Sequence, residues 1–155
     1  MMCLSLRQPW AHAVVHLGKT IENRRWGTTF RGDFLIHASK GMTKNEYLDA
    51  VSFCDAVLER GISNSILATG EMPQAKALPK GVIVGAARLV DVIPPCEHCV
   101  ERGFDCGGEH RKWHMPEQFG FVLEKIRPAP RLVPCVGHLG FFQVPDDVVA
   151  KLRAA

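Results

Sequence analysis

Residues 3–26 read CLSLRQPWAHAVVHLGKTIENRRW, and this stretch predicts a strand, a helix and a second strand in close succession. The first strand is expected over the largely apolar residues 3–6. Pro9 suits the first position of a helix, because its missing N–H has no helical acceptor there. Apolar residues then recur at helical spacing, and Gly18 suits the left-handed position that ends a helix. We expect the second strand over residues 20–26.

The rest of the chain combines further short strands with two more helices. Thr43-Lys44-Asn45-Glu46 is a capping-box pattern, and the apolar residues after it keep helical spacing up to Gly61, which we expect to end this helix. We expect strands at 33–38, 82–92, 119–125, 132–136 and 141–144, a surface loop at 62–80, a polar insertion at 94–117 and a helix at 146–155. This arrangement predicts an α+β fold with a small, curled or closed sheet, and one domain over residues 1–155.

The composition is that of an ordinary globular domain. The chain has 155 residues, of which 46% are hydrophobic and 23% are charged. No run reaches the roughly 18 apolar residues of a membrane span. The first residues lack the features of a signal peptide, so we expect a cytoplasmic protein that does not bind membranes. The net charge of +3 permits a nucleic-acid partner without requiring one, and nothing indicates an oligomeric state.

Ionisable residues gather around the corner at Gly18. Glu22 and Arg24 share one face of the predicted strand, and Lys19 lies at its start. A lysine, a carboxylate and an arginine can bind phosphate while the carboxylate acts as a general base. The same three residues can instead form an ion-pair network on the rim of a barrel, and both interpretations stay open. The remaining candidate binding residues are Arg7, Gln8, Trp10 and Trp26.

Aromatic residues near these basic positions are candidates for stacking on bases. Trp26 follows two arginines, and Trp113 lies in the polar insertion next to Lys112. Aromatic side chains interleaved with cations are typical of surfaces that bind single-stranded nucleic acid. Packing in the core is the alternative for each of them.

The insertion also has the spacing of a metal site, C-x2-C-x6-C-x3-H-x3-H. It predicts a structural zinc site with the ligands Cys96, Cys99, Cys106 and His110, and with His114 as the alternative fourth ligand. Ordinary free thiols and a redox pair are the other interpretations. A zinc ion with four protein ligands would hold a loop beside the cleft rather than catalyse, and no other cofactor is required.

Several motifs resemble the ASCH domain, the module named for its homology to activating signal cointegrator. The likeness covers nearly the whole chain apart from residues 62–80 and the Cys/His-rich insertion. The matching segments are Leu4–Ala11, Gly18-Lys19, Glu22-Asn23-Arg24, Trp26, Arg31-Gly32, Ile36-His37-Ala38, Gly81–Gly85, Leu89–Asp91, Phe119–Leu123 and Gly137–Val144.

The resemblance implies a PUA-like fold, a small β-barrel with flanking helices and a cleft. It also implies binding of RNA or DNA, with RNA favoured over DNA, or of a nucleotide, in a basic cleft around Lys19, Glu22 and Arg24. The alternative is a hydrolase that acts on RNA (a ribonuclease) or on a modified nucleoside. Glu22 would then be the general base, and Lys19 would stabilise developing negative charge.

One relative in this class removes the acyl group of acetylated cytidine with a lysine and a threonine three residues later. Lys19 matches that lysine, but Glu22 stands at the threonine position. The chemistry of that relative is therefore not expected here.

Overall fold

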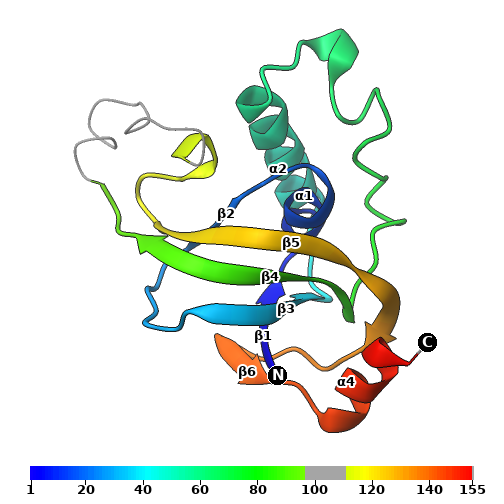
Figure 1. The fold of residues 1–155 in the computed structure, drawn as a ribbon. Helices are drawn as coiled ribbons and strands as arrows, with labels where there is room; N and C mark the ends of the chain where they lie inside the picture. The colour runs from blue at the N-terminus through cyan, green and yellow to red at the C-terminus, as the bar shows by residue number, and fades with distance from the viewer. Residues whose placement is uncertain (97–110, 155) are drawn as a thin grey trace.

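The computed structural model describes residues 1–96 and 111–154, and its main feature is one curled six-stranded sheet (Figure 1). The strand order across the sheet is β2-β5-β4-β3-β1-β6. The strands are β1 (Met2–Leu6), β2 (Ile21–Arg24), β3 (Gly32–Ala38), β4 (Val82–Ile93), β5 (Phe119–Pro134) and β6 (Phe141–Gln143).

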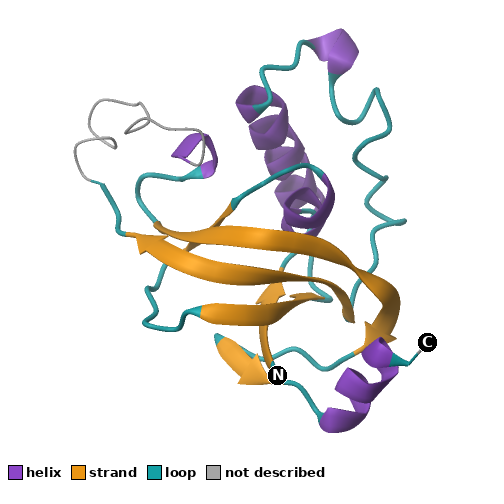
Figure 2. Cartoon of the chain, viewed as in Figure 1, coloured by secondary structure: helices purple, strands orange, loops and turns teal. Residues whose placement is uncertain are grey.

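Helices lie at two opposite ends of this sheet. Helices α1 (Trp10–His16) and α2 (Lys44–Val57) lie together on one side, and α4 (Asp146–Arg153) lies at the other end near the C-terminus (Figure 2). Two short 3₁₀ turns cover Ile62–Asn64 and Arg111–Trp113. The α+β class and the PUA-like small barrel that the sequence predicts are confirmed. None of the described helices is long and apolar enough to cross a membrane.

The sheet curls but leaves a seam between its two edge strands, β2 and β6. Strands β1 and β3 pair in parallel, and the other neighbours pair antiparallel. Aromatic rings pack across the seam, since Trp26 after β2 meets Phe141 of β6 edge to face at 6.3 Å. The seam matters because the larger cavity of the molecule opens there.

The turn after α1 has the predicted geometry. Helix α1 begins directly after Pro9, and Gly18 has a φ of +74°, in the left-handed region that glycine adopts without strain. Helix α2 starts at the predicted capping box, in which the side chains of Thr43 and Glu46 bond each other's backbone N–H. These local signals place Lys19 at the start of β2.

Gly85 allows a close approach between β4 and its neighbours. A Cβ atom at this position would lie 2.8 Å from the Arg127 carbonyl oxygen and 2.9 Å from a methyl group of Val15. Only glycine lets β4 pass this close to β5 and α1, and the pairing register shifts beside it.

Four expectations from the sequence are corrected. The segment 62–80 is not only a surface loop, because Ile66, Met72 and Leu78 are buried beside α2. Helix α2 ends before Gly61, and Glu59 takes the left-handed conformation. The ranges 119–125 and 132–136 belong to one strand, β5, which continues through its prolines beside register shifts. Trp113 is a core residue rather than a stacking platform, with 1% of its surface exposed.

Candidate functional site

Two neighbouring cavities contain the candidate residues. We call the smaller one the ionic pocket; it has a volume of about 110 Å³ and is lined by Trp10, Lys19, Glu22, Asn23, Met115 and Gln118. We call the larger one the cationic cleft; its volume is about 890 Å³, and its lining includes Ser5, Arg7, Arg24, Trp26, His37, Ser39, Lys40 and the loop 135–140.

In the ionic pocket, Glu22 lies between two cations. Its Oε2 atom is 3.2 Å from Lys19 Nζ, and its Oε1 atom is 3.1 Å from Arg24 Nε. The Arg24 Nε atom is buried and makes no hydrogen bond within the described residues, so its contact with Glu22 is ionic only. The three residues therefore form the ion-pair network that was one of the two interpretations, and Lys19 and Glu22 also line a pocket. Phosphate binding and general-base chemistry at this corner stay predictions.

Lys19 is nearly inaccessible to water. Its Nζ atom also donates to the Ile21 carbonyl oxygen and lies 5.3 Å from the centre of the Trp10 ring. Burial lowers the pKa of the Lys19 ammonium, and the Glu22 carboxylate offsets part of this effect. Three contacts thus offset the free energy of desolvating the Lys19 ammonium: the Glu22 carboxylate, the Ile21 carbonyl oxygen and the face of the Trp10 ring.

The size of the ionic pocket limits what it can hold. Small-molecule sites generally have volumes of about 300–1,000 Å³, whereas this pocket has about 110 Å³. Asn23 at its edge is engaged in structure, since its side chain bonds the Trp113 carbonyl oxygen and the Met115 N–H. Gln8 is buried outside it and bonds the Pro79 carbonyl oxygen and the His12 N–H.

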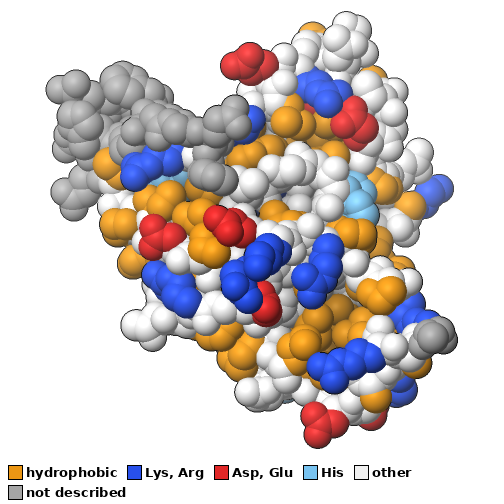
Figure 3. Space-filling view, viewed as in Figure 1, with side chains coloured by type: hydrophobic (Ala, Val, Ile, Leu, Met, Phe, Trp, Pro, Cys, Tyr) orange, Lys and Arg blue, Asp and Glu red, His pale blue; other side chains and the backbone are white. Residues whose placement is uncertain are grey.

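The cationic cleft has a different electrostatic character. Arg7, Arg24 and Lys40 line it, and no Asp or Glu is among its lining residues. The face over β4 and β5 contrasts with it, because Lys and Arg side chains there are interleaved with Asp and Glu (Figure 3). Elsewhere on the surface, Arg88 of β4 pairs with Asp33 of β3 at 2.8 Å. The cleft therefore concentrates positive charge without a compensating carboxylate on its wall.

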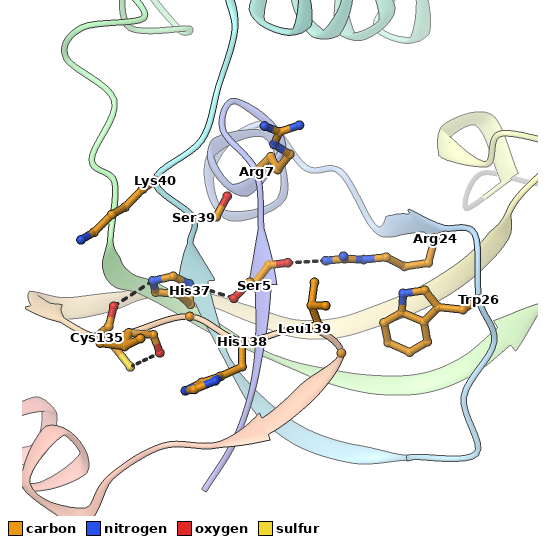
Figure 4. Close-up of a pocket in the computed structure, with 13 residues that line it drawn as sticks. Ser5, Arg7, Arg24, Trp26, His37, Ser39, Lys40, Cys135, His138 and Leu139 are labelled. Atoms are coloured by element: carbon orange, nitrogen blue, oxygen red, sulfur yellow. Dashed lines mark hydrogen bonds between the residues drawn. The ribbon is translucent and has the colours of Figure 1, made fainter.

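The three cations of the cleft differ in how firmly they are held. Arg24 Nη2 donates to the Ser5 carbonyl oxygen at 2.5 Å, so its side chain spans the seam from β2 to β1 (Figure 4). Arg7 is paired with Glu46 and bonds the Gly41 carbonyl oxygen. Lys40 is exposed and has no ion-pair partner in the part of the chain that the structure describes.

Ser5 and His37 form a hydrogen-bonded pair in the wall of the cleft. The parallel register of β1 and β3 sets Ser5 opposite His37, and the Ser5 Oγ atom lies 3.0 Å from His37 Nδ1. His37 Nε2 lies 3.1 Å from the Cys135 carbonyl oxygen. A carbonyl can only accept, so Nε2 carries the proton, and Nδ1 accepts from the Ser5 hydroxyl.

Apolar side chains form the rest of the cleft wall. Trp26 packs edge-on against Phe121 at 5.2 Å between ring centres, and the Arg24 guanidinium lies 5.9 Å from the Trp26 ring. Leu139, at the same end of the cleft, is 99% exposed, and Val136 is 74% exposed (Figure 4). Exposed large apolar residues beside a cationic cleft provide a surface for a flat hydrophobic group.

The zinc prediction falls largely on residues 97–110. Cys99, Cys106 and His110 lie outside the described residues. Cys96 is the last described residue before this range, and His114 Nε2 lies 2.7 Å from the Gln118 carbonyl oxygen. Among the described residues no group of three potential metal ligands occurs. The zinc site stays a prediction.

The structure thus divides the predicted residues between two places. Trp10, Lys19 and Glu22 line the ionic pocket, Arg7 and Trp26 line the cationic cleft, and Arg24 connects the two. Sequence reasoning missed Ser5, Ser39 and the loop 135–140 as parts of one site, and it named His37 without connecting it to them. The only available signal was the motif Ile36-His37-Ala38, and it becomes informative only with the parallel pairing of β1 and β3.

A curled PUA-like sheet with a basic cleft at its seam defines the general class of this protein. The family model of the ASCH domain matches residues 4–129, and the chain therefore belongs to the ASCH domain family. This membership places it in a PUA-like group that is generally associated with RNA. No curated protein matches the sequence.

Proposed function

We propose that the protein binds single-stranded RNA in the cationic cleft. The observation that carries this proposal is a cavity of about 890 Å³ with two arginines and a lysine, and without a carboxylate, on its wall. A nucleotide fits this volume, since ligand sites of this kind measure about 300–1,000 Å³. A wall of cations favours a polyanion, because each neutralised phosphate releases condensed counterions.

Arg24 and Lys40 are the residues that we expect to contact phosphates. Arg24 is held by the Ser5 carbonyl oxygen and by Glu22, so it loses little side-chain entropy on binding. Lys40 is exposed and has no ion-pair partner among the described residues, so no existing bond has to break. Arg7 contributes charge but shares it with Glu46.

Trp26 and Leu139 are the residues that we expect to hold a base. Stacking on an aromatic ring requires an unpaired base, which favours a single strand over a duplex. The choice of RNA over DNA is supported by the general association of the ASCH domain family with RNA.

Fluorescence anisotropy with a labelled single-stranded RNA and the DNA of the same sequence tests the proposal. The affinity should fall with salt, with a logarithmic slope of about −0.7 for each phosphate contact. Arg24→Gln should weaken binding, whereas Lys151→Gln on α4, which also removes one positive charge, should not. Absence of binding to any nucleic acid, or binding that does not respond to salt, contradicts the proposal.

A hydrolase that uses Glu22 and Lys19 is the second proposal. Its support is the lowered pKa of Lys19 and the contact of 3.2 Å between Lys19 Nζ and the Glu22 carboxylate. The ion-pair network is also an argument against this hydrolase. Each carboxylate oxygen of Glu22 contacts a cation, and Glu22 has to break one of these contacts before it can accept a proton as a base. Glu22→Gln should abolish hydrolysis of RNA or a modified nucleoside while binding persists, and equal turnover rules this role out.

We also propose a cytoplasmic location. Cys3, Cys54 and Cys135 are free thiols, and Cys3 and Cys54 are fully buried. Free thiols are typical of a reducing compartment.

A further inference from the structure

We propose that Ser5 and His37 are a nucleophile and general base that remove acyl groups from small esters carrying an anionic group. The proposal concerns a reaction, and it does not depend on RNA binding, because any anionic ester that enters the cationic cleft meets this pair. Its substrate class follows from two features, an activated hydroxyl and a wall of cations without carboxylates.

The pairing of β1 with β3 places the Ser5 and His37 side chains next to each other. Ser5 is half-buried and lines the cleft, whereas His37 is 2% exposed behind it. The distance of 3.0 Å between Ser5 Oγ and His37 Nδ1 is within reach for proton transfer. Their strands pair directly at these two residues, so the sheet itself fixes the geometry.

The base, His37, is oriented by a backbone carbonyl group. A serine nucleophile is activated where its base is held by a third group. The Cys135 carbonyl oxygen accepts from His37 Nε2 at 3.1 Å and fixes the tautomer that leaves Nδ1 free to take a proton. Burial lowers the pKa of His37, and the nearby His138 and Lys40 add to this, so the ring is neutral and can accept at pH 7.

Gly137 of the loop 135–140 covers the Ser5–His37 pair. A Cβ atom at Gly137 would lie 2.5 Å from His37 Cε1 and 2.7 Å from Ser5 Oγ. The backbone of the loop 135–140 therefore lies directly against the hydrogen bond, and only glycine fits there. The loop shields one side of the pair from water and leaves Ser5 facing the cleft.

The reaction then runs in two balanced stages. Ser5 Oγ attacks the acyl carbonyl carbon while its proton moves to His37 Nδ1, and the leaving alkoxide takes that proton as its bond to the acyl carbon breaks. Water next attacks the acyl-serine, giving one proton to His37 Nδ1, which returns it to Ser5 Oγ as the acid leaves. Arg24, bonded to the Ser5 carbonyl oxygen, is the held cation that we expect to stabilise the developing negative charge.

A carbonyl in place of a carboxylate behind His37 implies slow turnover, since it stabilises the imidazolium less than a full charge does. The first test is therefore covalent labelling with a fluorophosphonate, in which Ser5 Oγ displaces fluoride, followed by peptide mass spectrometry. The label should be found on Ser5. Ser5→Ala should abolish labelling, and His37→Gln should slow it about 100-fold or more. Ser52→Ala, which removes an exposed hydroxyl from α2, should leave it unchanged.

The second test compares 4-acetoxybenzoate with its methyl ester, because the two share one ester bond and differ by one negative charge. The wild-type protein should hydrolyse the anionic ester faster, and Ser5→Ala should remove this activity. Ser5→Ala removes only one hydroxyl group. A thermal unfolding curve that matches that of the wild-type protein shows that the variant is folded. Gly137→Ala should also lose labelling, because the new methyl group separates Ser5 from His37.

The result that overturns the proposal is a wild-type protein without the label on Ser5, or labelling at the same rate in His37→Gln. RNA affinity measured on Ser5→Ala separates this proposal from the binding function. In Ser5→Ala, retained RNA affinity with lost labelling supports both proposals. In the wild-type protein, labelling of Ser5 without any RNA affinity contradicts only the binding proposal.

Discussion

The ionic pocket and the cationic cleft are built from similar kinds of residue but differ in their electrostatics. Each has a tryptophan and a basic side chain, and Arg24 of the cleft also contacts Glu22 of the ionic pocket. In the ionic pocket Glu22 pairs with Lys19, and little space remains. In the cleft no carboxylate lies on the wall, and the cavity is about eight times larger, at about 890 Å³ against about 110 Å³. The comparison indicates that charge at the first serves stability and charge at the second is available to a ligand.

The largest effect that separates the two regions is expected from Glu22→Ala. The substitution leaves the buried Lys19 ammonium without its carboxylate, and removing one partner of a buried pair costs about 3–5 kcal/mol of unfolding free energy. Urea denaturation measures it. The control is Asp33→Ala, which breaks an exposed pair with Arg88 and should cost much less. Equal losses in the two variants contradict a structural role for the ionic pocket.

The second prediction compares the loss of Trp26 from the cationic cleft with the loss of Trp10 from the ionic pocket. Trp26→Ala should weaken the binding of single-stranded RNA by about 1–3 kcal/mol, the range for loss of one base-stacking ring. Trp10→Ala should change this affinity little, because Trp10 lines the ionic pocket. Anisotropy titrations of both variants give the answer. A larger loss for Trp10→Ala would move the ligand to the ionic pocket.

Lys40→Gln is expected to have a smaller effect that is visible mainly in the salt dependence. One lost phosphate contact lowers the logarithmic salt slope by about 0.7 for a single strand. Lys44→Gln, at the start of α2 and outside the cleft lining, is the matched control. An unchanged slope for Lys40→Gln shows that this lysine makes no phosphate contact.

The smallest effect is expected in the pH dependence of stability. The pKa of His37 is lowered by burial, so the unfolded chain binds this proton at a higher pH than the folded protein does. Stability is therefore complete above about pH 6.5 and is lost as pH falls through the lowered pKa. The groups that face His37 are Ser5, the Cys135 carbonyl, His138 and Lys40.

His37→Gln should flatten this loss between pH 7 and pH 5, measured by urea denaturation at each pH. Some slope should remain, because the pKa of His12 is also lowered by burial. A variant that loses stability as steeply as the wild type contradicts the assignment to His37.

The sequence predicts the ionic pocket better than the cleft, because the pocket is mostly local. Strand alternation, the glycine corner and the spacing from 19 to 24 bring Lys19, Glu22 and Arg24 together within six residues. The assignment of the chain to the ASCH domain and of the fold to the PUA-like class is confirmed from motifs of the same kind.

The cleft depends on pairings that no local pattern contains. Ser5, His37 and Cys135 come from three separate segments, and they meet only because β1 and β3 pair in parallel and the chain after β5 returns beside them. Trp113 shows the same limit from the other side. Its polar neighbours indicate an exposed position, but the core around Tyr47 and Ile66 buries it. Tertiary packing decides both cases.

The three tryptophan indole N–H groups allow the most direct test of where RNA binds. Trp26 lines the cationic cleft, Trp10 lines the ionic pocket, and Trp113 is buried in the core. In a ¹⁵N-labelled sample titrated with a short single-stranded RNA, we predict a saturable shift of the Trp26 indole resonance while those of Trp10 and Trp113 stay in place. A shift of Trp10 with an unmoved Trp26 would contradict RNA binding in the cationic cleft.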